Sequence, residues 1–437
     1  MSLNTPKTSL QEQASHADQQ TRLGRRSFMA GLTGVAALGL GSIATGRGAA
    51  TGVAQHQQLL ADDGAANDEF GTSVAIDRAT ETIVVGASND DNANGTDAGA
   101  VYVFTCQKNQ FVQIQKLLAS DGQAQDFFGT SVAIDGDTIV VGAIGDDENG
   151  DFAGAACVFE RQGDAFTETQ KLLASDGQAQ DFFGDSVAIA GDTIVGGAPL
   201  ENENGMEAGA AYVFERQDGS FAETQKLLAS DGQAGDEFGT SVAIVEDLII
   251  VGALFADNEN GVDTGVTYVF ERQGDAFTET QTLLADDGQA GDRFGGSVAI
   301  AGDTIVIGAL SENTNGEEAG AAYVFACRKI QFVQTQKLLA SDGQAGDEFG
   351  FSVGIEGDTI VVGAPFNDTE NGMDAGAVYV FTCQKNKFVE TEKLLASDGQ
   401  AGDEFGFSVA TDGWIIGGAP FNDTENGTET GAAYVFD

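Results

Sequence analysis

Basic residues, cysteine and proline are scarce in this chain, and each scarcity excludes a class of structure or partner. Only 20 lysines and arginines stand against 68 acidic residues, so the net charge at pH 7 is −48. A field of that sign disfavours nucleic acid and anionic lipid as partners. Four cysteines in 437 residues are too few for a disulfide scaffold. Proline is equally rare, and no Ser/Pro-rich linker divides the chain into separate domains.

Histidine is scarcer still, which limits the chemistry available to the protein. The chain has two histidines, and only His56 follows the N-terminal segment; we expect it at the surface of a short strand. A Ser-His-Asp triad and a histidine metal cluster are therefore not indicated. Pairs of carboxylates always occur in so acidic a chain, but no part of the sequence carries the unique insertion that a catalytic site usually brings. We predict that the protein is not an enzyme.

The acidity itself has two interpretations. The carboxylates could form a calcium-loaded surface, or they could be an adaptation to molar salt. In strong salt the Debye length is only about 3 Å, so self-repulsion is screened and the charge mainly retains water. We favour the second interpretation, because the composition resembles that of proteins from extreme halophiles of the haloarchaeal type. On this interpretation the acidity says little about the ligand.

Long hydrophobic runs are also lacking, except for one near the N-terminus. The pair Arg25-Arg26 follows a polar segment and precedes an apolar, Gly/Ala-rich stretch over about residues 29–44. This order is typical of a twin-arginine signal peptide, whereas about sixteen residues with several glycines are short for a membrane span. We predict a signal peptide over residues 1–50, cleaved near Ala50, and a secreted mature protein without membrane insertion. Retention of the segment as an anchor is the alternative.

One motif of about 55 residues fills the rest of the chain. Its Phe-Gly pair recurs at steps of 55 to 58 residues, beginning at Phe70, Phe128, Phe183, Phe238, Phe294, Phe349 and Phe405. Near-identical copies at a fixed period indicate a repeat architecture. Each copy contains four short strands, of which the fourth is polar and charged, as an exposed edge strand is. Four antiparallel strands per repeat are typical of a β-propeller blade.

The two ends of the repeat region complement each other. The last copy stops after its third strand, at residues 432–436, and residues 55–60 match the end of a fourth strand. We therefore predict an all-β fold over residues 51–437: a seven-bladed β-propeller of four-stranded antiparallel blades, whose ring is closed when the N-terminal strand completes the last blade. A solenoid would need capping repeats at both ends. We expect the closed ring to be a monomer.

The strand order separates long loops from tight turns. The loop after the second strand (366–376 in one copy) and the loop before the next first strand (397–404) should share one face, and both are acidic. Turns such as 356–358 should lie on the opposite face. We expect any binding surface on the long-loop face. The acidic sequence at 398–403 recurs in nearly every copy, which suggests that it caps backbone donors between blades.

The Phe-Gly pairs, together with Gly-Ala-Pro after the second strand (intact at Gly197, Gly363 and Gly418), resemble FG-GAP repeats. Those repeats build the seven-bladed propeller of integrin alpha subunits. The resemblance covers residues 55–437 and implies extracellular binding or adhesion, often with calcium. Integrin-type repeats carry an Asp-x-Asp-x-Asp-Gly-x-x-Asp loop between the two elements, whereas this chain has only a short turn there, such as 135–137. So short a turn cannot surround a calcium ion with six or more oxygens, and that site is not carried over.

The loop after the second strand offers a different candidate for a cation site. Its pattern alternates oxygen-bearing side chains around a glycine and ends on a carboxylate, which suits calcium. The alternative is an Asn-Gly turn in a solvated acidic loop, which needs no ion. The candidate metal ligands are Asp257, Glu259, Asn260, Asp263, Asp368, Glu370, Asn371, Asp374, Asp423, Glu425, Asn426 and Glu429.

Fold, charge and export together predict a function only by class. We expect a secreted, non-enzymatic binding or adhesion propeller that presents acidic loops on one face to a protein or glycan partner. Two alternatives stay open. One is a structural cell-surface or matrix protein bridged by divalent cations. The other is an extracellular hydrolase or lyase that uses carboxylates.

Overall fold

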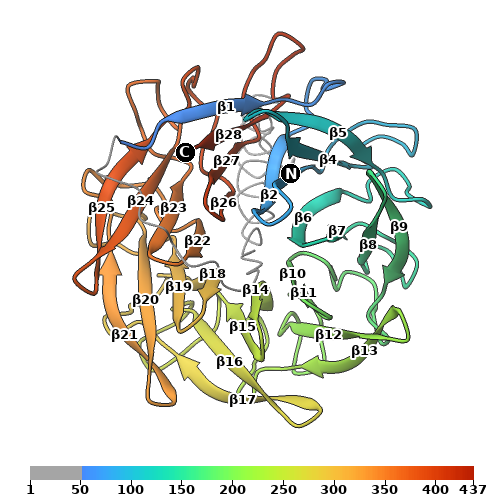
Figure 1. Cartoon of the computed structure of the whole chain (residues 1–437). Coiled ribbons are helices and arrows are strands. Elements are labelled where there is room, and N and C mark those ends of the chain that lie inside the picture. The colour runs from blue at the N-terminus through green and yellow to red at the C-terminus, as the bar shows by residue number, and fades with distance from the viewer. Residues whose placement is uncertain (1–51) are drawn as a thin grey trace, which may run out of the picture.

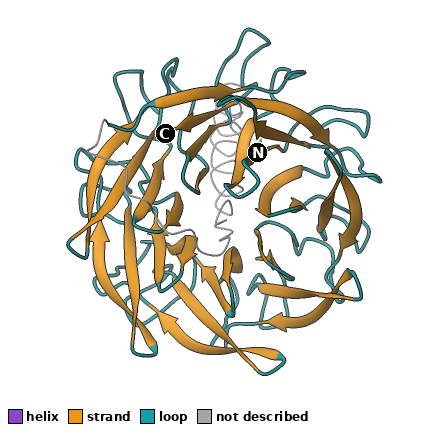
Figure 2. Cartoon of the chain, in the orientation of Figure 1, coloured by secondary structure: helices purple, strands orange, loops and turns teal. Residues whose placement is uncertain are grey.

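A computed structural model describes residues 52–437 of the protein. The predicted signal peptide and its cleavage site lie outside the described residues. The described chain forms 28 β-strands in seven four-stranded sheets, arranged as a ring of blades around a centre (Figure 1). All the regular structure in it is strand, joined by loops and turns (Figure 2), and no helix in this part of the chain could cross a membrane. The predicted seven-bladed β-propeller is confirmed.

Blades are numbered along the chain, and each begins with its innermost strand. Blades 1 to 3 consist of β2 (Phe70–Asp77), β3 (Thr82–Ala87), β4 (Ala100–Cys106), β5 (Phe111–Leu117), β6 (Phe128–Asp135), β7 (Thr138–Ala143), β8 (Ala155–Gln162), β9 (Ala165–Leu172), β10 (Val187–Ala190), β11 (Thr193–Ala198), β12 (Ala210–Gln217) and β13 (Ser220–Leu227). Blades 4 to 6 consist of β14 (Phe238–Val245), β15 (Leu248–Ala253), β16 (Val266–Gln273), β17 (Ala276–Leu283), β18 (Phe294–Ala301), β19 (Thr304–Ala309), β20 (Ala321–Arg328), β21 (Gln331–Leu338), β22 (Ser352–Glu356), β23 (Thr359–Ala364), β24 (Ala377–Gln384) and β25 (Lys387–Leu394). Blade 7 consists of β26 (Val409–Thr411), β27 (Ile415–Ala419), β28 (Ala432–Phe436) and β1 (Gln55–Leu59).

Burial explains why the strands of one blade differ in sequence. The second strand, such as β3 with the sequence TIVVGA, is buried along its whole length, because neighbouring blades cover both of its faces; it reads as a continuous apolar run. The fourth strand, such as β9 with the sequence AFTETQKL, alternates between buried and exposed positions, because one of its faces meets solvent. The predicted polar edge strand is thus the outermost strand of each blade.

The ring closes in blade 7. β1 pairs with β28 in antiparallel register, with Gln58 opposite Tyr434 and Leu59 opposite Ala433. Figure 1 shows the blue β1 beside the dark red β28, at the ends of the described chain. This pairing gives blade 7 its fourth strand and covers the edge of β28 that would otherwise be open, as predicted.

His56 is not at the open surface, so that expectation was wrong. Its ring lies 4.7 Å from the ring of Trp414, between ring centroids, and its Nε2 lies 2.9 Å from the carbonyl oxygen of Asn109 in blade 1. The residue is half-buried, because β1 lies at the seam between blades 7 and 1. Trp414, the single tryptophan of the chain, packs against Phe111 of blade 1 as well, so it belongs to the same seam.

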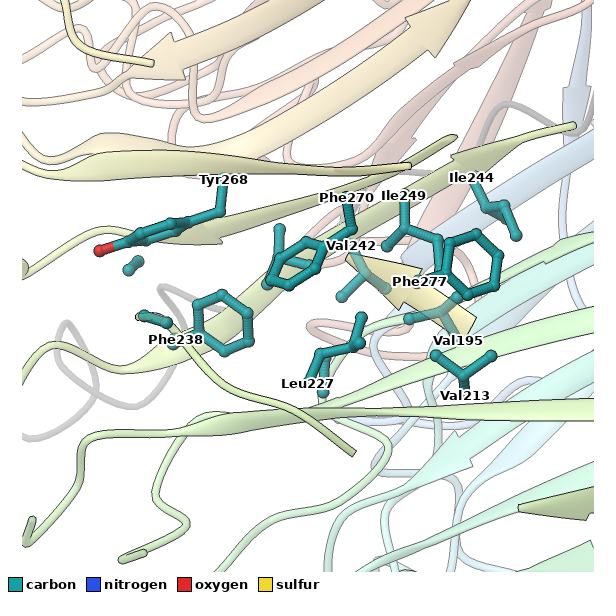
Figure 3. Close-up of a cluster of buried hydrophobic side chains, with 14 of the residues drawn as sticks. Val195, Val213, Leu227, Phe238, Val242, Ile244, Ile249, Tyr268, Phe270 and Phe277 are labelled. Carbon is teal, nitrogen blue, oxygen red and sulfur yellow. The ribbon is translucent and has the colours of Figure 1, made fainter. Parts of the chain in front are cut away.

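The hydrophobic core lies between the blades. In the cluster drawn in Figure 3, Val195 and Val213 of blade 3 pack against Phe238, Val242 and Tyr268 of blade 4. Equivalent clusters fill the other seams. Each blade therefore buries one face against each neighbour, and a single blade could not bury its apolar residues alone.

A glycine contact at every seam explains why Phe-Gly and Gly-Ala recur together. A Cβ on Gly197, in the Gly-Ala-Pro of blade 3, would overlap the carbonyl oxygen of Gly239 in the Phe-Gly of blade 4. The same carbonyl accepts a 2.8 Å hydrogen bond from the Ser186 hydroxyl. The equivalent glycine pairs at the other seams are Gly86–Gly129, Gly142–Gly184, Gly252–Gly295, Gly308–Gly350, Gly363–Gly406 and Gly418–Gly71. The two halves of the sequence motif thus belong to one contact between neighbouring blades.

Candidate functional site

The long loops between second and third strands lie on one face of the ring, together with the linking loops that lead from one blade to the next. At the seam of blades 1 and 2 the two kinds of loop are joined by backbone hydrogen bonds. Gln125, Phe127 and Phe128 of the linking loop donate to the carbonyl oxygens of residues 96, 97 and 98, at 2.8, 3.2 and 3.1 Å. The same ladder recurs around the ring. The next blade therefore fixes the backbone of each long loop, and the two loops share one face, as the strand order predicts.

Apolar side chains stand out from this face at the tips of three long loops. Met206 is 69% exposed, Val262 60% and Met373 67%. The carbonyl oxygens of these residues accept hydrogen bonds from the backbone of the next linking loop at 2.9 to 3.0 Å. Each tip thus has a fixed backbone and a free side chain. These residues were not among the predicted site residues.

A signal for the tips was nevertheless present in the sequence. The position directly after the loop glycine differs from blade to blade, whereas its neighbours hardly change. Its occupants in blades 1 to 7 are Thr96, Asp151, Met206, Val262, Glu317, Met373 and Thr428. A variable side chain on an invariant backbone is typical of a recognition surface rather than of packing.

The predicted cation ligands lie in the long loops of blades 4, 6 and 7, where the first carboxylate of each set closes its own loop. The Oδ1 atoms of Asp257, Asp368 and Asp423 accept the N–H of the last residue of the pattern, at 2.9 to 3.0 Å. Those last residues are Asp263, Asp374 and Glu429. The three aspartates are themselves exposed, and so are Glu259, Asn260, Glu370, Glu425 and Asn426.

Asn371, unlike the aspartate of its set, connects its loop to the neighbouring blade. Its side-chain amide donates to the carbonyl oxygen of Ala396 in the next linking loop, at 2.9 Å. The Asn-Gly turn is therefore held to the neighbouring blade by its asparagine. Calcium binding by the three loops stays a prediction.

Another group of carboxylates comes closer together than the predicted ones. Asp176, Glu201 and Glu203 in blade 3 offer ligand oxygens within 4.8 Å of one another, the one such group found over residues 52–437. The ammonium of Lys226 on β13 lies among them, 2.8 Å from Asp176, 3.0 Å from Glu201 and 2.8 Å from Glu203. The lysine already supplies a positive charge at this place.

The same lysine cluster recurs in five blades. A lysine near the end of the fourth strand contacts the aspartate of a Ser/Asp-Asp-Gly sequence in the linking loop, and it also contacts a buried acid or amide of the long loop. The lysines are Lys116, Lys171, Lys226, Lys337 and Lys393. In most blades a tyrosine hydroxyl of the third strand donates to the same aspartate, for example Tyr212 to Asp176 at 2.8 Å.

Wherever the lysine of a cluster is missing, the carboxylate of the long loop is missing too. In blade 4, Ala256 occupies the position of Glu201 and Thr282 the position of Lys226. In blade 7 the corresponding positions hold Asn422 and Gln58, so an amide replaces each charge. A buried carboxylate is costly without a partner, which accounts for the joint loss. We conclude that the lysine clusters hold the long loop to the outer strand.

The recurring linking-loop acids cap backbone donors, but within their own loop. The aspartate two residues before each Phe-Gly pair is buried, and its Oδ2 accepts the N–H of the residue three positions earlier, as Asp403 does from Gln400 at 2.8 Å. Capping between blades comes instead from the fourth strand, where Glu168 accepts the N–H of Ser120 at 2.7 Å. The linking-loop acids thus cap backbone donors, as predicted, but only donors of their own loop. The capping between blades that was predicted for them is done by a glutamate of the fourth strand.

Burial gives these capping aspartates an unusual titration. It raises the pKa of Asp68 and of Asp126 to about 6, and the pKa of the five equivalent aspartates is also raised. The cluster aspartates behave in the opposite way. Burial alone would raise their pKa, but hydrogen bonds from lysine and tyrosine outweigh it and lower the pKa of Asp63, Asp176, Asp287 and Asp342.

We therefore expect thermal stability to fall as the pH rises from about 4 to about 6. In that pH range the capping aspartates of the folded protein still hold protons, whereas the same residues in the unfolded chain have released them. Each such aspartate therefore stabilises the fold at low pH, and that stabilisation, on the order of 1 kcal/mol for each pKa unit by which its pKa is raised, is lost as the pH rises. Below about pH 4 the cluster aspartates lose their advantage and stability should fall again. Thermal melts at constant salt would measure both slopes. An Asp126→Asn variant, whose amide oxygen can still accept the loop hydrogen bond, should flatten the upper slope; a melting temperature that climbs from pH 4 to 7 would contradict the assignment.

Comparison with known proteins gives a consistent result. Seven stretches match the FG-GAP repeat: residues 53–104, 111–159, 166–214, 221–270, 277–325, 332–381 and 388–436. The chain is 31% identical to human (Homo sapiens) integrin alpha-11 over 188 residues, which is 39% of this chain and 15% of that protein. It is 26% identical to mouse (Mus musculus) integrin alpha-2 over 245 residues, 50% of this chain and 20% of that protein. The chain thus matches a fifth or less of the length of these relatives.

Proposed function

Because the chain belongs to the FG-GAP repeat family, we propose that it is a non-enzymatic binding or adhesion protein that holds a protein partner on its long-loop face. The likeness to integrin alpha chains supports a binding role. The observation that carries the proposal is the exposure of Met206, Val262 and Met373 on loops whose backbone is fixed.

The tips combine two properties that favour binding. Large apolar side chains that are more than half exposed are costly to leave in water, and methionine is enriched at protein interfaces because its flexible thioether adapts to a partner. The backbone ladder removes most of the loop motion that binding would otherwise have to freeze, so little entropy is lost. The surrounding carboxylates form the polar rim. Apolar tips favour a protein over a glycan, which is the other outcome of the test below.

The place of action follows from the N-terminal segment. Secretion through the twin-arginine route, with cleavage near Ala50, would deliver the folded propeller to the outside of the cell. The charge of −48 would keep it hydrated in molar salt. Calcium would be a cofactor of the exposed loop carboxylates and not of the lysine clusters, which an ammonium already fills.

The proposal predicts that binding depends on the tips. We would immobilise the propeller (residues 52–437) and pass over it the envelope proteins and, separately, the envelope glycans of the cells that make it. A Met206→Ser/Met373→Ser variant should lose about tenfold or more in affinity for the bound component, as expected for two interface anchors. The matched control is Gln217→Ser/Gln384→Ser, which changes exposed residues of the same blades on the opposite face and should bind like the wild type.

Each result of this experiment has a clear reading. Equal binding by the tip variant and the control would refute the long-loop face as the binding surface, and retention of glycans alone would replace the protein partner by a glycan. Repeating the measurement with a chelator tests the calcium expectation. Loss of binding with chelator and in a Glu370→Gln/Asp374→Asn variant would assign a cation to that loop.

A further inference from the structure

The hairpins that join third and fourth strands divide the blades into two classes. They lie on the tight-turn face, opposite the long loops. In blades 2 to 4 the tip of this hairpin carries an exposed acid: Asp164, Asp218 and Asp275. In blades 1, 5 and 6 it carries exposed basic residues instead: Lys108, Arg328, Lys329, Lys385 and Lys387.

These cations stand out because most other basic residues of the described chain are occupied. Five lysines lie in the lysine clusters of the long-loop face. Arg161, Arg216 and Arg272 in blades 2 to 4 each pair with an aspartate of the neighbouring turn, at 2.8 to 3.1 Å, and each lies over a phenylalanine ring at 4.3 Å. Blades 1, 5 and 6 have an unbonded cysteine at that arginine position. Within residues 52–437, none of the five hairpin cations forms an ion pair.

The basic tips have apolar neighbours. Ile330, at the tip in blade 5, is 85% exposed. The outer strands of blades 1, 5 and 6 expose Val112, Val333 and Val389, where blades 2 to 4 have Thr167, Ala222 and Thr278. Blades 5, 6, 7 and 1 are consecutive in the ring (Figure 1). We call the five basic tip residues with Ile330 and the three valines the basic arc, and Asp164, Asp218 and Asp275 the acidic arc.

We propose that the basic arc of one molecule binds the acidic arc of a second copy. The chain itself supplies both surfaces, on the same hairpin of the same repeat. Blades repeat with one geometry, so the spacing between the neighbouring basic tips of blades 5 and 6 matches that between neighbouring acidic tips in blades 2 to 4. Ion pairs at the tips would surround the apolar contact of Ile330 and the valines, an arrangement of polar rim and apolar centre that interfaces use.

Such a contact has a defined consequence for assembly. Both arcs lie on the same face of the ring, so a twofold axis between two copies places each basic arc on the other copy's acidic arc, and the contact closes as a dimer. The long-loop face stays free for the partner proposed above, so this inference goes beyond that function and does not depend on it. It also departs from the monomer expected from the sequence, because the position of the basic hairpins on one arc becomes apparent only in the ring.

The test uses sedimentation velocity on residues 52–437 in molar KCl, where the Debye length is about 3 Å and repulsion between copies is screened. The weight-average mass of the wild type should rise with concentration to about twice that of the monomer and stop there, as dimers form. Two variants each remove charge from one arc, the first of them at the neighbouring blades 5 and 6. The basic-arc variant is Arg328→Ser/Lys329→Ser/Lys385→Ser/Lys387→Ser, and the acidic-arc variant is Asp164→Ser/Asp218→Ser/Asp275→Ser.

Each variant alone should stay monomeric, whereas their mixture should form dimers more weakly than the wild type, since only one of the two pairs of arcs is left intact. All seven substitutions are at exposed positions, so thermal melts should match the wild type. A wild type that is monomeric at every concentration overturns the proposal, as does association that survives in both variants. Binding of the wild type, but not the basic-arc variant, to vesicles with anionic lipid, without self-association, would identify a lipid surface as the occupant instead.

Discussion

A Gly197→Ala substitution should lower the free energy of unfolding by about 3 kcal/mol or more, the upper range for overpacking a close-packed site. The added methyl group would overlap the carbonyl oxygen of Gly239 in the next blade. That carbonyl belongs to the backbone and is held by the Ser186 hydroxyl, so it cannot move aside as a flexible side chain could. Chemical denaturation of residues 52–437 would measure the loss.

A matched glycine in the same blade provides the control. Gly191, in the turn between β10 and β11, has a φ of 56° and no atoms within 4 Å of a built Cβ. Asparagine tolerates such a backbone, so Gly191→Asn should change stability by less than about 1 kcal/mol. If the two variants lost the same free energy of unfolding, the close glycine contact between blades would not contribute more to stability than an ordinary turn glycine.

Removal of residues 52–60 should cost on the order of 5 kcal/mol, from the lost strand ladder and the exposure of Leu59. β28 would then be an unpaired edge strand, and such edges recruit other strands. We expect a lower melting temperature and concentration-dependent aggregation. Light scattering during a thermal melt would detect both effects.

A synthetic peptide with the sequence of residues 52–62 supplies the control for this truncation. It should add to the open edge of β28 as a fourth strand and restore much of the lost melting temperature, whereas a peptide with the same residues in scrambled order should not. If the truncated protein melts like the intact one, ring closure by β1 contributes little to stability.

The fold could be predicted because the same strand and turn pattern occurs seven times in the sequence. Seven copies of Phe-Gly fixed the number of blades, and the incomplete last copy could be matched with residues 55–60. Counting the blades requires no knowledge of long-range contacts, because blades 1 to 6 are each built from residues that are near in sequence, and the closing strand of blade 7 was found by matching it to the fourth strands of the other copies. The error on His56 has the opposite cause, since its environment is made by Trp414 and Asn109, which lie in other blades.

The candidate site was harder to predict for the same reason. The sequence predicts Asp368 as a metal ligand, and it does not show that the Oδ1 of this residue also accepts a backbone N–H six residues later. Lys226 and Glu201 looked unrelated, because the sequence does not show that the end of the fourth strand lies under the long loop. The joint loss of charge at Ala256 and Thr282 was visible in the sequence, but it acquires a meaning only when the two positions are known to meet.

The pairing of β1 with β28 also sets an order of events. Gln58 and Tyr434 are joined by a hydrogen bond across 376 residues of chain, so the pairing of these two strands has a larger loop to close than the pairing within any other blade. During synthesis, β1 is the first strand to emerge and has no partner until residue 436 has been made, while the complete blades between β1 and β28 can already pack against one another. Ring closure therefore distinguishes a complete chain from an incomplete one. A chain that ends before its last strand leaves an open sheet edge at each end of the array of blades, and proteases and chaperones can bind such edges.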